Sequence, residues 1–313
     1  MTGLELSEGY FREYGLPMLE ARFPHLLPHL AAGLCGSGSE CFGYDDAVST
    51  DHDFEPGFCL FLPGEETVSR RDAFLLERAY ASLPKEYAGF RRGLVAPVGG
   101  PRRGVMRTAD FFVRHAGTPD GALTPLQWLS VPEYALAEAV NGRVFMDRAG
   151  EFTRIRHLLS RWPEDVRRKK LAGQLLLMAQ AGPYNYGRCL RHGEEGAAQL
   201  AVGEFVRAAM AAVFLLNGAY QPYYKWAFRA LRGLGKLSLL AELFEYLLTT
   251  GNDSTIREEK QKVMEGISQD VLREVRLQGL SPSPSDDPET QAYQVQAGIR
   301  DGEIRGLHIL AAV

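Results

Sequence analysis

The chain has 313 residues with 35 Lys and Arg against 39 Asp and Glu, a formal net charge of −4, and 45% hydrophobic residues. This balance excludes a protein that relies on a global positive field to hold nucleic acid, although a local basic patch is compatible with it. No apolar run approaches the roughly 18 residues that span a bilayer, so we expect a soluble protein without a membrane segment. At about 150 residues per domain, the length predicts two domains.

The four cysteines, Cys35, Cys41, Cys59 and Cys189, form neither a CxxC pair nor a Cys/His group with zinc-ligand spacing. We therefore expect no structural zinc site. The first residues, MTGLELSEGYFREYG, mix charged side chains with scattered apolar ones, unlike the basic start and apolar centre of a signal peptide. We expect a cytoplasmic protein with reduced thiols.

The first part of the chain alternates helical and strand-like patterns. Apolar residues at spacings of three and four predict helices over 8–30 and 66–91. Short apolar runs predict strands over 30–35, 58–62 and 104–108.

Helical patterns dominate the rest of the chain. After a predicted helix at 132–140 and a predicted strand at 143–147, almost all of 151–279 has a helical period. Residues 280–288 are a polar, Pro/Ser-rich linker, and a last helix is predicted over 289–305.

These patterns predict an α+β protein. A domain with a mixed sheet covers 1–150, and an all-helical domain, which includes the linker and the last helix, covers 151–313. A ligand that needs both domains would bind between them.

Two aspartates, Asp51 and Asp53, are the first candidates for chemistry. On an extended strand, residues two apart lie on one face, with β-carbons roughly 7 Å apart. Two carboxylates at that distance repel each other and gain from a shared divalent cation. The pair therefore predicts a site for Mg²⁺ or Mn²⁺.

A glycine-rich turn, Gly36-Ser37-Gly38-Ser39, follows the first predicted strand. Small residues let the backbone approach a phosphate closely, and the hydroxyls of Ser37 and Ser39 add hydrogen-bond donors. An ordinary loop is the alternative. A dinucleotide-binding turn is disfavoured because Cys41 stands where the third glycine of that fingerprint belongs. A phosphate cradle beside a metal-holding carboxylate pair indicates phosphoryl or nucleotidyl transfer.

The spacing from Cys35-Gly36-Ser37 to Asp51-His52-Asp53 resembles the signature of the polymerase-β-like nucleotidyltransferase superfamily. More narrowly, GSGSECFGYDDAVSTDHDFEPG is similar to the DUF4037 family, as are VNGRVFMDRAGEFTRIR, QAGPYNYGRCLRHG and VFLLNGAYQPYYKWAFRAL. The resemblance extends from about residue 30 to about residue 250. It implies a catalytic domain followed by a helical domain, arranged as in nucleotidyltransferases of the kanamycin type.

The resemblance also implies a third carboxylate on a later strand, in an apolar-acid-apolar pattern. In the predicted strand at 104–108, Met106 occupies the place of that acid. Asp110, just beyond this strand, and Asp147, at the end of the 143–147 strand, are the nearest substitutes. Without such a group, the protein could bind a nucleotide but lack the base that deprotonates an acceptor hydroxyl.

The helical domain offers further candidate contacts. Arg188 and Arg191 could bind a triphosphate in bidentate fashion, and Lys225 could reach a phosphate from within the aromatic cluster Tyr220–Trp226. The alternative for both segments is packed aromatic side chains with solvated cations. The basic run Arg167–Lys170 is predicted to cover a solvated helix face, because four consecutive helical residues cannot all face one ligand. The alternative is that one or two of them contact the acceptor or a polyanion.

We therefore expect a Mg²⁺-dependent nucleotidyltransferase that moves AMP from ATP to a hydroxyl acceptor and releases pyrophosphate. Asp51 and Asp53 would hold the metal, and Asp110 would complete the catalytic carboxylates. A small molecule is the expected acceptor, with a protein hydroxyl or a tRNA end as alternatives. The rival hypothesis is a nucleotide-binding or interaction module that has lost catalysis, for example in a toxin–antitoxin pair.

Overall fold

The computed structural model of the chain describes residues 1–46, 54–93, 102–311 and 313. The chain divides into two compact units. The first unit comprises Met1–Leu123 and Val131–Ser160, and the second comprises Thr124–Ser130 and Arg161–Val313. Most described residues are helical, and a small mixed sheet accompanies them, which confirms the α+β class.

The sheet of the first unit has four strands in the order β5-β2-β1-β6. β1 (Ala31–Leu34) pairs antiparallel with both β2 (Cys59–Leu62) and β6 (Arg143–Asp147). β2 pairs in parallel with β5 (Gly104–Arg107). The strands that the sequence predicts are therefore present, and the sheet is mixed.

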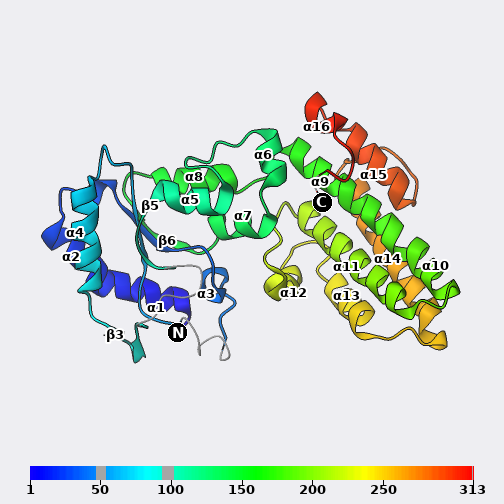
Figure 1. Ribbon diagram of the computed structural model, residues 1–313, viewed down its shortest axis with the longest axis horizontal. Coiled ribbons are helices and arrows are strands. Elements are labelled where there is room, and N and C mark those ends of the chain that lie inside the picture. The colour runs from blue at the N-terminus through cyan, green and yellow to red at the C-terminus, as the bar shows by residue number, and fades with distance from the viewer. Residues whose placement is uncertain (47–53, 94–101, 312) are drawn as a thin grey trace. The chain divides into compact units, whose positions relative to one another are not determined.

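Helices and a short hairpin surround this sheet (Figure 1). The helices and hairpin strands of the first unit are α1 (Gly3–Tyr10), α2 (Leu16–Arg22), α3 (Ser39–Phe42), α4 (Arg70–Ala81), β3 (Glu86–Tyr87), β4 (Phe90–Arg91), α5 (Thr108–Ala116), α7 (Glu133–Val140) and α8 (Glu151–Leu159). Five π-helical residues, Phe11–Gly15, join α1 to α2, and a 3₁₀ turn, Leu27–His29, leads into β1. Although α8 begins after residue 150, it belongs to the first unit.

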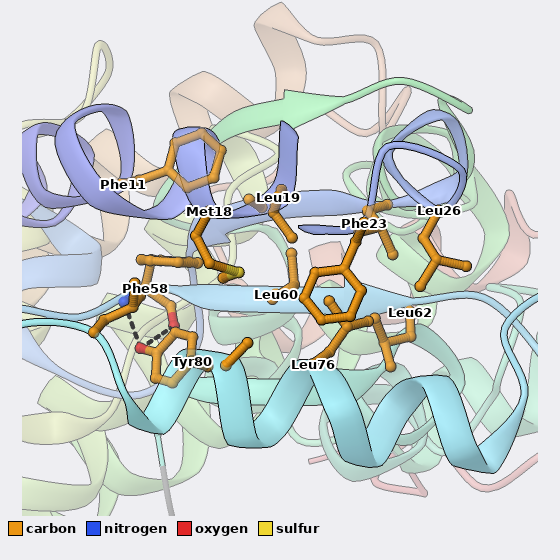
Figure 2. Close-up of a cluster of buried hydrophobic side chains, with 14 of the residues drawn as sticks. Phe11, Met18, Leu19, Phe23, Leu26, Phe58, Leu60, Leu62, Leu76 and Tyr80 are labelled. Atoms are coloured by element: carbon orange, nitrogen blue, oxygen red, sulfur yellow. Dashed lines mark hydrogen bonds between the residues drawn. The ribbon is translucent and has the colours of Figure 1, made fainter. Parts of the chain in front are cut away.

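One face of the sheet packs against α1, α2 and α4, as Figure 2 shows. Leu60 and Leu62 point from β2 into this core, where they meet apolar side chains such as Leu19 and Leu76. The Tyr80 hydroxyl accepts a hydrogen bond from the Phe58 N–H (3.0 Å) and donates one to the Phe58 carbonyl (2.8 Å). These bonds satisfy the hydroxyl, which lets a buried tyrosine fix the start of β2 against α4.

The other face of the sheet packs against α5 and α8. Phe61 alternates with Leu60 and Leu62 along β2, so its ring points to the opposite side. It stacks on Phe152 of α8 with centroids 3.9 Å apart and meets Phe111 of α5 at 5.2 Å. Because both faces are covered, the two central strands, β1 and β2, are continuous apolar runs rather than alternating ones.

The N-terminal helix begins earlier than predicted. Thr2 and Glu5 form a capping box, in which each side chain accepts a backbone N–H of the other residue, so the helix starts at Gly3 instead of near residue 8. Pro17 lies at the start of α2, where its missing N–H costs little. The helix predicted over 66–91 ends at Ala81, and the hairpin follows it.

The second unit consists of helices. They are α6 (Pro125–Ser130), α9 (Glu164–Ala179), α10 (Tyr186–Arg191), α11 (Glu195–Leu216), α12 (Tyr224–Arg232), α13 (Leu240–Thr249), α14 (Ser254–Leu277), α15 (Pro288–Ala297) and α16 (Gly302–Gly306). Six π-helical residues, Gln180–Asn185, connect α9 to α10. The last predicted helix is thus two helices, α15 and α16.

α11 is the central helix of this unit, and its C-terminal half is almost entirely buried. Among the described residues, α11 is the one helix that is long and apolar enough to cross a membrane. However, 72% of its most apolar window is buried inside the protein, as in the core helix of a soluble protein. Glu204 and Arg207 interrupt its apolar run, which is why the sequence contains no continuous segment of that length.

The prediction that Arg167–Lys170 forms a solvated face is wrong. Lys169 is 0% exposed, and its ammonium group donates to the Gln296 side-chain oxygen (3.0 Å) and the Leu307 carbonyl (2.8 Å). Arg168 donates to the Leu280 carbonyl (3.0 Å). The run therefore anchors the C-terminal segment to α9.

Candidate functional site

The turn after β1, Gly36–Ser39, is the centre of the candidate site. Gly36 has φ = 104° and Gly38 has φ = 129°, values that side chains with a β-carbon rarely adopt. α3 begins directly afterwards at Ser39. The sequence correctly predicts a glycine turn at the end of a buried strand. We call these residues the Gly36 turn.

The end of α7 holds the Gly36 turn from one side. The Gly36 N–H donates to the Asn141 side-chain oxygen, and the Asn141 amide donates back to the Gly36 carbonyl, both at 2.8 Å. The Gly142 N–H donates to the Cys41 carbonyl (2.8 Å). Arg156 in turn donates to the carbonyls of Val140 and Asn141. We call the hydrogen bonds of Asn141 and Gly142 with the turn and α3 the Asn141 clamp. They fix the backbone of the turn before any ligand binds.

Ser37 has a carboxylate partner that the sequence analysis missed. Its hydroxyl donates to Glu138 (2.9 Å), and the same Glu138 oxygen lies 3.3 Å from Nδ1 of His115. His115 is buried and packs against the Phe111 ring. The sequence signal was weak, because Glu138 is one acid in an ordinary helix, three residues before Asn141.

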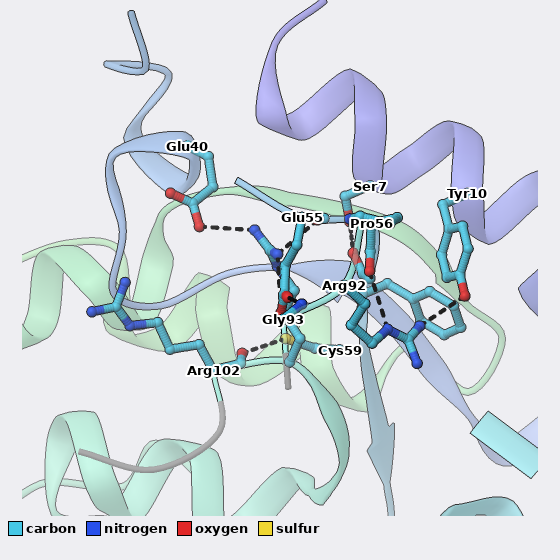
Figure 3. Close-up of polar contacts among 12 residues, drawn as sticks. Ser7, Tyr10, Glu40, Glu55, Pro56, Cys59, Arg92, Gly93 and Arg102 are labelled. Carbon is cyan, nitrogen blue, oxygen red and sulfur yellow. Dashed lines mark hydrogen bonds and ion pairs between the residues drawn. The ribbon is translucent and has the colours of Figure 1, made fainter. Parts of the chain in front are cut away.

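A buried arginine, Arg103, contacts Glu40, the residue that directly follows the turn; Figure 3 shows the polar contacts around Glu40 and Glu55. Arg103 forms an ion pair with Glu40 of α3 (3.1 Å) and donates to the Glu55 backbone carbonyl (2.7 Å). The Arg103 and Glu40 side chains are 9% and 8% exposed. Among the described residues, Arg103 Nε has no hydrogen-bond partner. Arg103 thus connects α3 to the segment that follows Asp53 in sequence.

Three cysteines line the interior beside the turn. Burial raises the pKa of Cys35 to about 11 and that of Cys59 to about 12, and it raises the pKa of Cys41 well above its usual range. The Cys59 thiol lies 3.3 Å from the Arg102 carbonyl. These thiols stay protonated at neutral pH, so they pack as small apolar groups.

The predicted metal ligands, Asp51 and Asp53, lie outside the described residues. Within the ranges that the structure does describe, no group of three or more His, Cys, Asp or Glu side chains is arranged to hold a metal ion. The predicted metal site at Asp51 and Asp53 therefore stays a prediction.

The two candidates for a third carboxylate lie on different elements, Asp110 on α5 and Asp147 on β6. Asp110 is exposed on the first turn of α5, and Phe111 and His115 of the same helix contact the turn at Gly36. Asp147 pairs in register with Ala31, at the opposite end of β1 from the turn. Its carboxylate accepts the N–H groups of Gly150 (2.9 Å) and Thr153 (2.8 Å) and so caps the start of α8.

The predicted phosphate contacts of the helical domain do not form one group. Arg188 and Arg191 are on α10, which packs along the first part of α11, whereas Lys225 is on α12, beyond the other end of α11. A helix of 22 residues is about 33 Å long. Arg188 lies over the Tyr184 ring, at 5.2 Å from its centroid, and donates to its hydroxyl (2.6 Å).

Comparison with known families adds one match. Residues 128–227 match the family described as Domain of unknown function (DUF4037). This match confirms the similarity to the DUF4037 family over residues 128–227. The DUF4037 range contains Glu138 and Asn141, which hold the Gly36 turn, but it does not include the turn itself. No curated protein and no solved structure matches the chain.

Proposed function

We propose that this protein is a Mg²⁺-dependent nucleotidyltransferase that moves AMP from ATP to a hydroxyl acceptor and releases pyrophosphate. The observation that carries the proposal is the Arg103 bridge. It connects Glu40, which follows the Gly36 turn by one residue, to Glu55, which follows Asp53 by two. The two halves of the sequence motif are therefore anchored by one buried side chain, as a joint phosphate and metal site requires.

Each part of the motif has a chemical role in this proposal. The hydroxyls of Ser37 and Ser39 and the backbone of the Gly36 turn would donate to phosphate oxygens. Asp51 and Asp53 suit Mg²⁺ or Mn²⁺, because these ions prefer carboxylate ligands. When bound, the ion offsets the charge of the triphosphate. Catalysis would then consist mainly of positioning and charge neutralisation.

Two carboxylates are candidates for the base that accepts the proton of the acceptor hydroxyl. The sequence favours Asp110, and the geometry adds Glu138, which already contacts the Ser37 hydroxyl. Comparing Asp110→Asn with Glu138→Gln distinguishes them. The variant that lacks the base should lose transfer while it keeps nucleotide binding.

The proposal is tested by incubating the protein with Mg²⁺ and ATP labelled at the α-phosphate. Label should appear on the protein itself or on a member of an acceptor panel of hydroxylated small molecules, proteins and tRNA. Asp53→Asn should abolish the transfer, whereas Glu77→Gln, which removes an exposed carboxylate from α4, should not. Equal labelling by the wild type and Asp53→Asn would refute the proposal.

The second candidate function is a nucleotide-binding or interaction module without catalysis. Met106, in the place of the expected acid on β5, favours it. Calorimetry separates the two functions: ATP binding with Mg²⁺ but no turnover on any acceptor supports the module. Absence of ATP binding counts against both functions.

A further inference from the structure

The second unit contains a cavity whose lining comes from three places in the sequence. They are the end of α9 with the π-helical connection that follows it, the middle of α14, and the residues around the start of α15. The cavity has a volume of about 570 Å³, which is the size of a small-molecule site. We call it the α14 cavity.

Four carboxylates line the α14 cavity, and no Lys, Arg or His does so among the described residues. They belong to Glu265, Asp286, Asp287 and Glu289. Asp286 pairs with Arg276 (3.1 Å), and Asp287 accepts the Thr290 N–H (2.8 Å). Glu265 accepts a hydrogen bond from the neutral Gln261 amide (3.1 Å), and Glu289 has no ion pair within the described part of the chain. The charges of the two glutamates are therefore not neutralised by a cation.

Helix capping accounts for only part of this negative charge. Asp287 caps α15 and Glu289 lies in its first turn, where acids stabilise a helix without any ligand. Glu265 has no such role, because it lies in the middle of α14. The α14 cavity is therefore more acidic than the stability of its helices requires.

Two uncharged groups of the cavity also suit a cation. Ser268 is 5% exposed, its hydroxyl donates to the Met264 carbonyl (2.9 Å), and no described residue donates to its oxygen. Tyr184 is 59% exposed, and the Arg188 guanidinium already lies 5.2 Å from its ring centroid. The cavity thus offers a buried acceptor and an aromatic surface together with its carboxylates.

The carboxylates of the cavity do not converge on one point. Within the ranges that the structure describes, no group of three or more His, Cys, Asp or Glu side chains is arranged to hold a metal ion. Ala179, Pro183 and Pro288 add apolar surface to the lining. Separated negative charges and apolar surface match a flexible apolar chain that carries separated positive charges.

We propose that the α14 cavity binds an alkyl polyamine, a chain of methylene groups with two or more ammonium groups. Glu265 and Ser268 lie three residues apart on α14, so they face the same side and receive one ammonium group together. Glu289 receives another, and the methylene groups pack on Pro183 and Tyr184. This binding requires neither nucleotide nor metal at the Gly36 turn, so it holds or fails independently of the nucleotidyltransferase proposal.

The test is isothermal titration calorimetry of the full-length protein with spermidine at low salt. Hexaamminecobalt(III) is the comparison, because it has the same charge and also donates N–H groups but is compact and has no methylene groups. Spermidine should bind at one saturable site and more tightly than the cobalt complex. Added NaCl should weaken the binding, because salt screens ion pairs that are open to solvent.

Matched variants separate the cavity from the rest of the acidic surface. Glu265→Gln and Glu289→Gln should each weaken spermidine binding about fivefold. Glu258→Gln, exposed on α14, and Glu303→Gln, exposed on α16, should leave it unchanged. All four glutamates are exposed, so these variants should fold. Ser268→Ala should weaken binding about threefold, because the ammonium group loses an acceptor.

Hydrogen exchange followed by mass spectrometry locates the site. Spermidine should slow exchange at the start of α15 and leave α4 unchanged, because the ligand joins α15 to α14. Exchange that slows equally in α4 and α15 would show that spermidine acts as a general counter-ion, which overturns the proposal.

Three calorimetric results also overturn the proposal. The first is no saturable binding of spermidine at low salt, and the second is equal affinity for hexaamminecobalt(III). The third is binding that the double variant Glu265→Gln, Glu289→Gln leaves intact. A lysine-rich peptide tests the rival occupant. If this peptide binds and the double variant abolishes its binding while spermidine does not bind, the α14 cavity is a protein contact and the polyamine proposal is wrong.

Discussion

Glu138 has one carboxylate oxygen in contact with two partners, the Ser37 hydroxyl and the buried His115. A phosphate in the Gly36 turn would compete for the Ser37 proton and would lie close to the Glu138 charge. The arrangement therefore holds the serine in place while it opposes anion binding.

We predict that Glu138→Gln binds ATP with Mg²⁺ more tightly than the wild type. Glutamine keeps the size and an acceptor oxygen but removes the negative charge, so the dissociation constant should fall about fivefold, which corresponds to about 1 kcal/mol. Isothermal titration calorimetry measures it. Glu151→Gln, at an exposed position on α8, is the control. Unchanged or weaker binding by Glu138→Gln would show that the carboxylate does not oppose the nucleotide.

The buried thiols predict a loss of stability at alkaline pH. The folded pKa values of Cys35, about 11, and Cys59, about 12, lie above that of an unfolded cysteine. The folded state therefore keeps protons that the unfolded state releases. Their contribution to the free energy of unfolding is complete below about pH 8.5, the pKa of an unfolded cysteine. It is lost as the pH rises through the pKa values of the folded state.

Urea unfolding at a series of pH values should show this loss between pH 9 and 11. Each thiol should lower the free energy of unfolding by up to about 1.4 kcal/mol per pH unit in this range. Cys59→Ala should flatten the decline. The buried Lys169 and Lys260 have lowered pKa values and act in the opposite direction, so the comparison with the wild type isolates the thiol. An unchanged slope in Cys59→Ala would contradict the assignment.

Between elements, α15 provides a hydrogen-bond acceptor for the buried Lys169 ammonium group of α9. The Gln296 side chain accepts a hydrogen bond from Lys169 (3.0 Å). We predict that Gln296→Leu lowers the free energy of unfolding by about 1–3 kcal/mol, because the buried ammonium loses an acceptor. Gln294→Leu, two positions earlier on α15, is the matched control, and thermal denaturation is the measurement. Equal effects of the two substitutions would indicate a general loss of packing.

The two best-predicted elements, β1 and β2, are strands that neighbours cover on both faces, so a continuous apolar run marks them without any knowledge of those neighbours. The opposite case is Arg167–Lys170. A 3.6-residue period spreads these side chains around α9, and their acceptors, such as Gln296 and Leu307, lie more than 100 residues later. Only the tertiary structure brings such distant partners together.

The same contrast applies to the candidate site. Gly36 and Ser37 could be located from the sequence, because glycines after a buried strand indicate a turn. Glu138, Asn141 and Arg103 could not, since they are ordinary polar residues that lie more than 60 residues from the turn in sequence. Their contribution depends on the pairing of strands and on where α7 ends.

At the scale of the whole molecule, each unit has its own hydrophobic core. Phe58 is fully buried in the first unit and Phe205 in the second. Removing either ring should cost about 3–5 kcal/mol within its own unit. The DUF4037 range, residues 128–227, covers parts of both units, so this family match does not define a folding unit.

Hydrogen exchange followed by mass spectrometry tests this independence. Phe58→Ala should speed exchange in β1, β2 and α4 and leave α11 protected, and Phe205→Ala should do the reverse. If either substitution speeds exchange equally in both units, the chain unfolds as one cooperative body.

The Asn141 clamp also affects how the protein ages chemically. An Asn-Gly bond deamidates when the glycine nitrogen attacks the asparagine side chain. In the folded protein this nitrogen donates a hydrogen bond to the Cys41 carbonyl. The Asn141 side-chain oxygen accepts from the Gly36 N–H, and its amide nitrogen donates to the Gly36 carbonyl. Local opening at the end of α7 would expose the bond. The resulting aspartate could no longer donate to the Gly36 carbonyl, and its negative charge would lie beside the turn. Each opening would therefore carry a risk of irreversible damage, and deamidation at Asn141 would record how often the clamp has opened.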